Sequence, residues 1–152
     1  MTQSSNDFTW EVSHELDVYN SPLDHRAISD LLGLQATRAW NNGEPHDRVN
    51  KPPYTFSRWI YSTRTWQGDT AAFNSGDHTE PLRELLVHLH ARRSGIETVL
   101  SGATLTLLTV IHSDSFNIGY GLPPDCARLL ADLNMRWYVD AYLSPMPDIQ
   151  LQ

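Results

Sequence analysis

Histidine is the residue type of this chain best suited to binding metal, but the seven histidines lack the spacing of ligands. His88 and His90 stand two residues apart in a segment of helical periodicity, so their side chains point about 200° away from each other. Helical metal ligands are usually four residues apart, which places them on one face. The other histidines occur singly: His14, His25, His46, His78 and His112. We therefore predict that His88 and His90 are solvated and that the chain has no metal site.

The residue types of a nucleophilic enzyme occur side by side in His112-Ser113-Asp114-Ser115. Neighbours at the end of a strand point to different sides, so these residues cannot form the hydrogen-bonded relay of a catalytic triad. Cys126, the single cysteine, lies on the apolar stripe of an expected helix, where it acts as a small hydrophobe. One cysteine also excludes an internal disulfide. We expect a protein that is not an enzyme and has no cofactor.

Gly119 and Gly121 resemble a fragment of a phosphate-binding loop. The segment lacks the third glycine and the basic residue of such loops, and the prolines at 123 and 124 have no backbone N–H to donate to phosphate. The formal net charge of −7 also repels nucleic acids and anionic membranes, whereas it favours an encounter with a basic protein surface. We expect a basic protein as the partner, and neither nucleic acid nor a membrane.

The length of 152 residues with 40% hydrophobic residues is enough for one packed core, so we predict a single domain over residues 1–152. Residues 1–7 and 145–152 are expected to be loose termini. The longest apolar stretch, Leu105 to Ile111, is much shorter than the roughly 20 residues that cross a bilayer. Residues 1–7 have neither the basic nor the apolar region of a secretory signal, so we expect a cytoplasmic protein.

Two segments alternate between apolar and polar residues and are predicted to be half-buried strands. In the first, residues 8–19, the inward set is Phe8, Trp10, Val12, His14, Leu16 and Val18. Its outward set includes Glu11, Glu15, Asp17 and Tyr19. In the second, residues 135–143, the inward set is Met135, Trp137, Val139, Ala141 and Leu143, and the outward set includes Tyr138, Asp140 and Tyr142.

The remaining elements follow from turn residues and helical stripes. Ser21 as N-cap and Pro22 at the first position begin a helix that ends at Gly33. Further helices are expected over 79–93 and 122–133, further strands over 35–40, 54–63 and 103–112, and a loop over 65–76. This order predicts an α+β fold, a ferredoxin-like sandwich with a mostly antiparallel sheet and the helices on one face.

A weak internal repeat is visible at a constant offset of 101 residues. The segment from Pro22 through Asp24 to Gly33 matches the segment from Pro123 through Asp125 to Asn134 in its caps and apolar stripe. The match suggests two related β-α-β halves.

The chain as a whole resembles the bacterial domain of unknown function 4279. The resemblance rests on Ser21-Pro-Leu-Asp24 with Leu31-Leu32-Gly33-Leu34, on Trp40-Asn-Asn-Gly43-Glu44, on Ser57-Arg58-Trp59, on the Leu-rich helix and on Asp140-Ala-Tyr142. It implies a small stand-alone bacterial α+β protein with no established activity, some of whose relatives are suspected to be immunity proteins beside toxins. It implies no catalytic residue.

Two functional hypotheses remain. In the first, the outward residues of the two alternating strands form an acidic, tyrosine-dotted surface that binds a basic protein, as an immunity-type inhibitor binds a toxin or effector. The residues of this surface are Glu11, Glu15, Asp17, Tyr19, Tyr138, Asp140 and Tyr142. In the alternative, Trp40, Trp59 and Trp66 with the loop 41–50 form an aromatic pocket of a small-ligand sensor.

Overall fold

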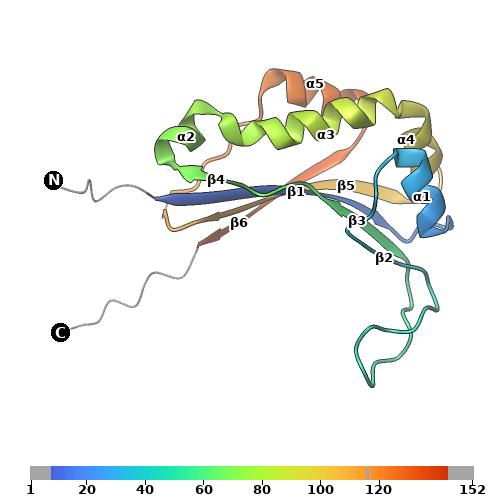
Figure 1. Cartoon of the computed structure of the whole chain (residues 1–152). Coiled ribbons are helices and arrows are strands. Elements are labelled where there is room, and N and C mark those ends of the chain that lie inside the picture. The colour runs from blue at the N-terminus through green and yellow to red at the C-terminus, as the bar shows by residue number, and fades with distance from the viewer. Residues whose placement is uncertain (1–7, 116, 144–152) are drawn as a thin grey trace, which may run out of the picture.

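The computed structural model describes residues 8–115 and 117–143. The expectation of loose termini concerns residues outside these ranges. Figure 1 shows one twisted β-sheet with all helices on one side of it. The predicted α+β class, with helices on one face, is therefore confirmed.

Over the described residues the sheet contains six strands: five follow the order β2-β3-β1-β5-β6, and β4 pairs with the other end of β1. The strands are β1 (Thr9–Tyr19), β2 (Arg38–Trp40), β3 (Arg58–Ser62), β4 (Trp66–Asp69), β5 (Thr104–Ser113) and β6 (Arg136–Leu143). β1 is antiparallel to β3, β4 and β5, and β2 is antiparallel to β3. Among the described strands only β5 and β6 pair in parallel, because a helix carries the chain back between them. The sheet is thus mostly antiparallel, as predicted.

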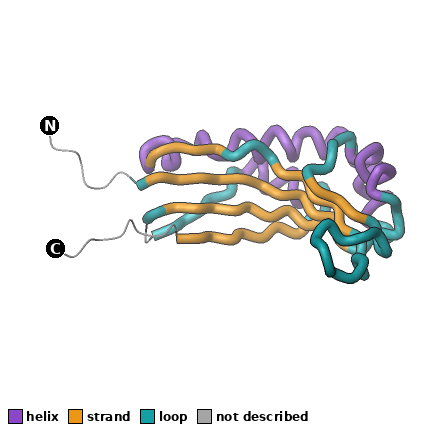
Figure 2. Tube along the Cα trace, turned by 60° about the horizontal axis from the view of Figure 1, so that its bottom comes forward, coloured by secondary structure: helices purple, strands orange, loops and turns teal. Residues whose placement is uncertain are grey.

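The helical layer covers one face of this sheet. It is formed by α1 (His25–Leu32), α2 (Thr70–Ser75), the 3₁₀ turn η1 (Asp77–Thr79), α3 (Glu80–Ala91), α4 (Arg93–Leu100) and α5 (Pro124–Asp132). Figure 2 shows the sheet from the other side, with the strands in front of the helices. The long β2–β3 connection, residues 41–57, projects from one end of the sheet (Figure 1).

The structure contains a β-α-β unit in each half. β5-α5-β6 joins neighbouring parallel strands, whereas β1-α1-β2 joins strands separated by β3. Gly33 and Asn134, which the internal repeat aligns, both adopt left-handed backbone conformations with φ of 64° and 51° after their helices. The repeat therefore extends to the helix ends but not to the strand pairing.

The core is divided into two clusters along the sheet. The larger one packs α1, α3, α4 and α5 on inward residues of β1, β3 and β5, including Leu16, Trp59 and Leu107. The smaller one consists of Trp10, Val12, Phe73 and Ile111. Between them on the same face lies the buried polar pair His14 and Thr109, which oppose each other in the β1–β5 register.

The predicted loop over 65–76 is wrong, because this segment forms β4 and α2. Trp66 pairs with Val12 of β1, and the Asp69 carboxylate caps α2 by accepting a hydrogen bond from the Ala72 N–H. Phe73 then stacks on Trp10, with ring centroids 4.0 Å apart. These elements are too short for a periodic pattern, so the tertiary contacts define them.

Two helix boundaries also differ from prediction. α1 begins after Asp24, whose carboxylate accepts from the Arg26 N–H, so Asp24 and not Ser21 is the N-cap. Arg92 and Arg93 do not end the helical region, because the chain bends at Arg92 and continues as α4.

The backbones of α1 and α4 approach closely at Gly95. A Cβ atom at this position would lie 2.2 Å from the carbonyl oxygen of Leu31. Only glycine permits this approach.

Gly95→Ala is therefore expected to destabilise the protein, although alanine is the better helix former by about 1 kcal/mol. Overpacking outweighs propensity and lowers the net free energy of unfolding by about 1–2 kcal/mol in a denaturant titration. Gly119→Ala is the matched control, because its Cβ would meet no atom within 4 Å. A more stable Gly95→Ala protein would contradict the close packing of α1 on α4.

Candidate functional site

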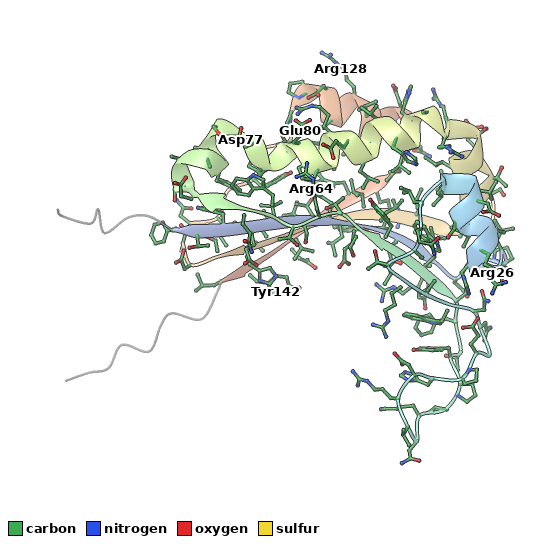
Figure 3. The ribbon with its side chains drawn as sticks, in the orientation of Figure 1. Arg26, Arg64, Asp77, Glu80, Arg128 and Tyr142 are labelled. Carbon is green, nitrogen blue, oxygen red and sulfur yellow. The ribbon has the colours of Figure 1, made fainter. Side chains whose placement is uncertain are left out.

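The sheet face that turns away from the helices is the candidate site, and we call it the open face. It is formed by alternate residues of β1, β5 and β6, fixed by the strand register. These residues are Glu11, Ser13, Glu15, Asp17 and Tyr19, then Thr104, Thr106, Leu108, Val110 and His112, and finally Arg136, Tyr138, Asp140 and Tyr142. In Figure 3, Tyr142 lies below the sheet, on the side opposite Glu80 and Arg128 of the helical layer.

All seven residues that the sequence assigns to a partner-binding surface lie on the open face. The four on β1 and the three on β6 are separated by β5, which corresponds to about 10 Å across the sheet. Leu108 lies between Glu15 and Tyr138, and His112 lies between Glu11 and Tyr142. The surface is therefore continuous, with half-buried apolar side chains of β5 in its middle.

Asp17 is the most strongly bound carboxylate of the open face. The Arg58 guanidinium donates to both Asp17 oxygens, with Nη2 at 2.6 Å from Oδ2 and Nε at 3.2 Å from Oδ1. The side chains are 36% and 22% exposed for Arg58 and Asp17, and the hydrogen bonds to Asp17 raise the pKa of Arg58. The Asp17 carboxylate therefore links β1 to β3, and the positive charge of Arg58 largely offsets its negative charge.

The other carboxylates of the face are more available. Glu11 accepts a hydrogen bond from the Gln67 amide at 2.9 Å, and Asp140 lies 3.5 Å from the Tyr142 hydroxyl. Within residues 8–115 and 117–143, Glu11, Glu15 and Asp140 form no ion pair. These three side chains can meet a cation without first losing another one.

An aromatic ladder folds the projecting segment 41–57 against one end of the open face. Ring centroids are 4.4 Å apart for His46 and Tyr54, 4.6 Å for Tyr54 and Trp40, 5.7 Å for Trp40 and Phe56, and 5.3 Å for Phe56 and Tyr19. Arg38 lies over the Trp40 ring at 4.9 Å. The ladder ends on Tyr19 and thereby joins the segment to the candidate surface.

The inward set of the second alternating strand is wrong as a buried set. Trp137 is half-buried, but Val139, Ala141 and Leu143 are exposed on the helix side. Alternation fixes the side to which a residue points, whereas burial also requires a helix above it, and the helices cover only the first part of β6 (Figure 1).

The three tryptophans of the alternative pocket do not converge. Trp40 is on the open-face side in the ladder, while Trp59 faces the helices, is fully buried and donates to the Ser29 hydroxyl at 2.9 Å. Trp66 lies beside Phe73 near the other end of β1. Trp40 pairs with Arg58, and Trp59 is the next residue of β3. Because successive residues of a strand point to opposite faces, Trp40 and Trp59 lie on opposite faces of the sheet.

A buried histidine cluster was missed by the sequence analysis. His14 Nδ1 lies 2.9 Å from the Thr109 hydroxyl, which also accepts from Trp137 Nε1 at 2.9 Å. His78 stacks on Phe73 at 4.3 Å. Within this cluster, His14 Nε2, His78 Nδ1 and the Tyr120 hydroxyl are buried without a hydrogen-bond partner among the described residues. The signal available was the position of His14 in an otherwise apolar strand face.

Burial controls the ionisation of this cluster. Desolvation, with a smaller contribution from His78, lowers the pKa of His14 to about 4, and desolvation also lowers the pKa of His78. Burial raises the pKa of Tyr120 to about 12. These groups are neutral near pH 7 and are held in the core as packing groups.

The prediction for the paired histidines is partly wrong. His88 is half-buried, and its Nε2 lies 2.9 Å from the Leu32 carbonyl oxygen at the end of α1. His90 Nε2 lies 3.8 Å from the Asp132 carboxylate, and the His90 side chain is 41% exposed. His88 thus satisfies a carbonyl that the end of α1 leaves without a helical partner.

A wide cleft of about 700 Å³ lies between residues 73–83 and 119–123. Its cation, Arg83, already pairs with Asp125 at 2.6 Å and with Glu80 at 3.1 Å. In the ranges that the structure covers, no group of three or more His, Cys, Asp or Glu side chains is placed to hold a metal ion. Nor does any helix there have the length and apolar character to cross a membrane.

The fold and the open face define an α+β protein with one helical layer on a mixed sheet. The chain belongs to the DUF4279 family, described as a domain of unknown function, whose model matches residues 10–144. Comparisons with curated proteins and with solved structures gave no match.

The role of Asp17 can be tested by comparing two carboxylates of one strand face. Asp17→Asn removes the bidentate pair with Arg58 and is expected to lower the free energy of unfolding by about 1 kcal/mol at low salt. Glu15→Gln should change it by less than about 0.5 kcal/mol. Equal effects in denaturant titrations would show that the Asp17–Arg58 pair does not stabilise the sheet.

The buried histidines predict an acid-sensitive core. Because the pKa of His14 is lowered from 6.5 to about 4, its stabilising effect is complete above pH 6.5 and is lost as the pH falls towards 4. The loss is roughly 3 kcal/mol for this shift. Denaturant titrations between pH 7.5 and 4 measure it.

In these titrations His14→Gln is expected to remove more than half of the pH dependence, since Gln does not titrate. His90→Gln is the control, because the His90 side chain is 41% exposed. An unchanged slope in His14→Gln would contradict a neutral His14 in the folded protein.

Proposed function

We propose that this chain is a non-enzymatic protein-binding module whose open face docks on a basic surface of another protein. The observation that carries the proposal is the combination, on one sheet face, of exposed tyrosines with carboxylates that form no ion pair with any described residue. Tyr19, Tyr138 and Tyr142 are 49%, 53% and 49% exposed.

The two residue types have different tasks in this proposal. Tyrosine supplies a large contact area with little loss of conformational entropy and is enriched among residues that dominate binding energy. Glu11, Glu15 and Asp140, with the net charge of −7, attract a cationic partner and raise the association rate. Leu108 and Val110 of β5, which lie between the residues of β1 and β6, lose their remaining contact with water when a partner covers the face.

The more specific form of the proposal is an immunity-type inhibitor in the bacterial cytoplasm, which blocks a basic toxin or effector by covering its charged surface. This form is supported by the acidic residues of the open face and by the resemblance to a family some of whose members are suspected to be immunity proteins. Blocking of this kind needs no catalytic group, and the ionisable groups of the buried cluster are neutral near pH 7.

The geometry does not favour a small-ligand sensor, because the tryptophans proposed to line its pocket lie on different faces and at different ends of the sheet.

The proposal is tested by retention of a basic protein from a lysate of the source organism at low salt, followed by titration calorimetry with the identified protein. Glu11→Lys/Glu15→Lys is expected to weaken its affinity at least tenfold, and raising the salt concentration should weaken wild-type binding. Asp17 is left unchanged because its loss disturbs β3.

The matched control is Glu84→Lys/Glu97→Lys, which makes the same change of charge on exposed residues of α3 and α4 in the helical layer. If the affinity falls equally for both double variants, net charge and not the open face determines binding. If neither variant nor salt changes the affinity, the proposed mode of binding is wrong.

A further inference from the structure

Strand β6 carries an unusual concentration of exposed apolar side chains. Tyr138, Val139, Tyr142 and Leu143 are 53%, 38%, 49% and 49% exposed. In the described part of the chain, the other large exposed hydrophobic residues are Tyr19 on β1, Val49 in the β2–β3 connection and Val87 on α3. β6 thus carries exposed apolar side chains on both of its faces, and neither face is covered beyond Trp137 by the described residues.

β6 is also an unprotected edge of the sheet. Within the described residues it pairs only with β5, so the N–H and C=O groups on its other side have no strand partner. Edge strands are normally protected by proline, lysine, a bulge or short length. β6 has eight residues in unbroken register with β5 and contains neither proline nor lysine, whereas the opposite edge, β2, has three residues.

The charges of β6 indicate which strand fits this edge. The strand contains one cation, Arg136, and one anion, Asp140, four residues apart on the open face. Directly opposed residues of antiparallel strands point to the same face. Two copies of β6 related by a twofold axis therefore pair with even-numbered residues opposite even-numbered ones and odd-numbered residues opposite odd-numbered ones.

We infer that β6 pairs antiparallel with β6 of a second copy, around a twofold axis at Tyr138. In this register Arg136 opposes the partner's Asp140, and Asp140 opposes the partner's Arg136, so the dimer gains two cross-strand ion pairs. The register centred on Val139 opposes Arg136 to a tyrosine, and the register centred on Asp140 brings two carboxylates together. Charge complementarity therefore selects the first register.

In this register residues 136–140 of the two strands oppose one another, and the apolar side chains within this range agree with it. Tyr138 lies beside the partner's Tyr138 on the open face, and Trp137 lies beside the partner's Val139 on the helix side. A twofold axis perpendicular to the sheet keeps both open faces on one side and both helical layers on the other. The dimer would present a sheet continuous across two copies.

Sedimentation velocity of the full chain over a range of concentrations tests the inference. The wild type is expected to show a concentration-dependent monomer–dimer equilibrium. Arg136→Asp and Asp140→Arg each replace attraction by repulsion at two positions and should weaken the dimer about tenfold or more. The double variant Arg136→Asp/Asp140→Arg restores the opposed charges and should restore the wild-type dissociation constant.

Circular dichroism and thermal unfolding verify that each variant is folded before it is scored. A wild type that stays monomeric at millimolar concentration would overturn the inference. Failure of the double variant to recover dimerisation would overturn the register. Val139→Lys, on the helix side of β6, should weaken the dimer without touching the ion pairs, and an unaffected dimer in this variant would exclude the β6 edge.

Tyr138 and Asp140 belong to both proposed surfaces, but the variants that test the two proposals lie on different strands. Glu11→Lys/Glu15→Lys changes β1 and should leave dimerisation intact, whereas Arg136→Asp should yield a monomer that retains the carboxylates of β1 for partner binding. A failure of either proposal is therefore visible by itself.

Discussion

The antiparallel pairing of β1 with β5 determines the rest of the structure. Ten consecutive residue pairs, from Trp10 with Ser113 to Tyr19 with Thr104, fix which side chains of both strands face the helices. Leu16 and Leu107 then share the large core cluster, while Glu15 and Leu108 share the open face. A slip of one residue would exchange the two faces and bury the carboxylates, so the hydrophobic pattern and the candidate surface are specified together.

The same pairing places a polar residue pair inside the core. His14 and Thr109 oppose each other between the cluster of Val12 and Ile111 and the cluster of Leu16 and Leu107. The Trp137 indole N–H donates to the Thr109 hydroxyl and thereby connects β6 to this polar pair. The end of the sheet beneath α2 is therefore held by stacked aromatic rings and by histidines whose pKa burial lowers, and we expect acid to weaken it.

The sequence allowed prediction of the features that depend on local alternation and failed where the contacts are distant. The faces of β1 followed from residues 8–19 alone, because period-two alternation needs no knowledge of neighbours. The Asp17–Arg58 pair joins residues 41 positions apart, so its neutralising effect could not be predicted from either segment. β4 and α2 are short and are defined by the contacts of Trp66 and Phe73 with β1. On β6 the alternation was present, but the helix that would have covered Val139 and Leu143 was not.

The account rests on the claim that the open face is the surface that meets another protein. The most direct measurement is ¹⁹F NMR of the protein labelled with fluorotyrosine at its six tyrosines, titrated with the basic protein that it retains. The account predicts that the resonances of Tyr19, Tyr138 and Tyr142 shift or broaden, while those of Tyr61 and Tyr120, which pack on the helix side, stay in place. Shifts confined to Tyr61 and Tyr120, with the three open-face tyrosines unchanged, would contradict it.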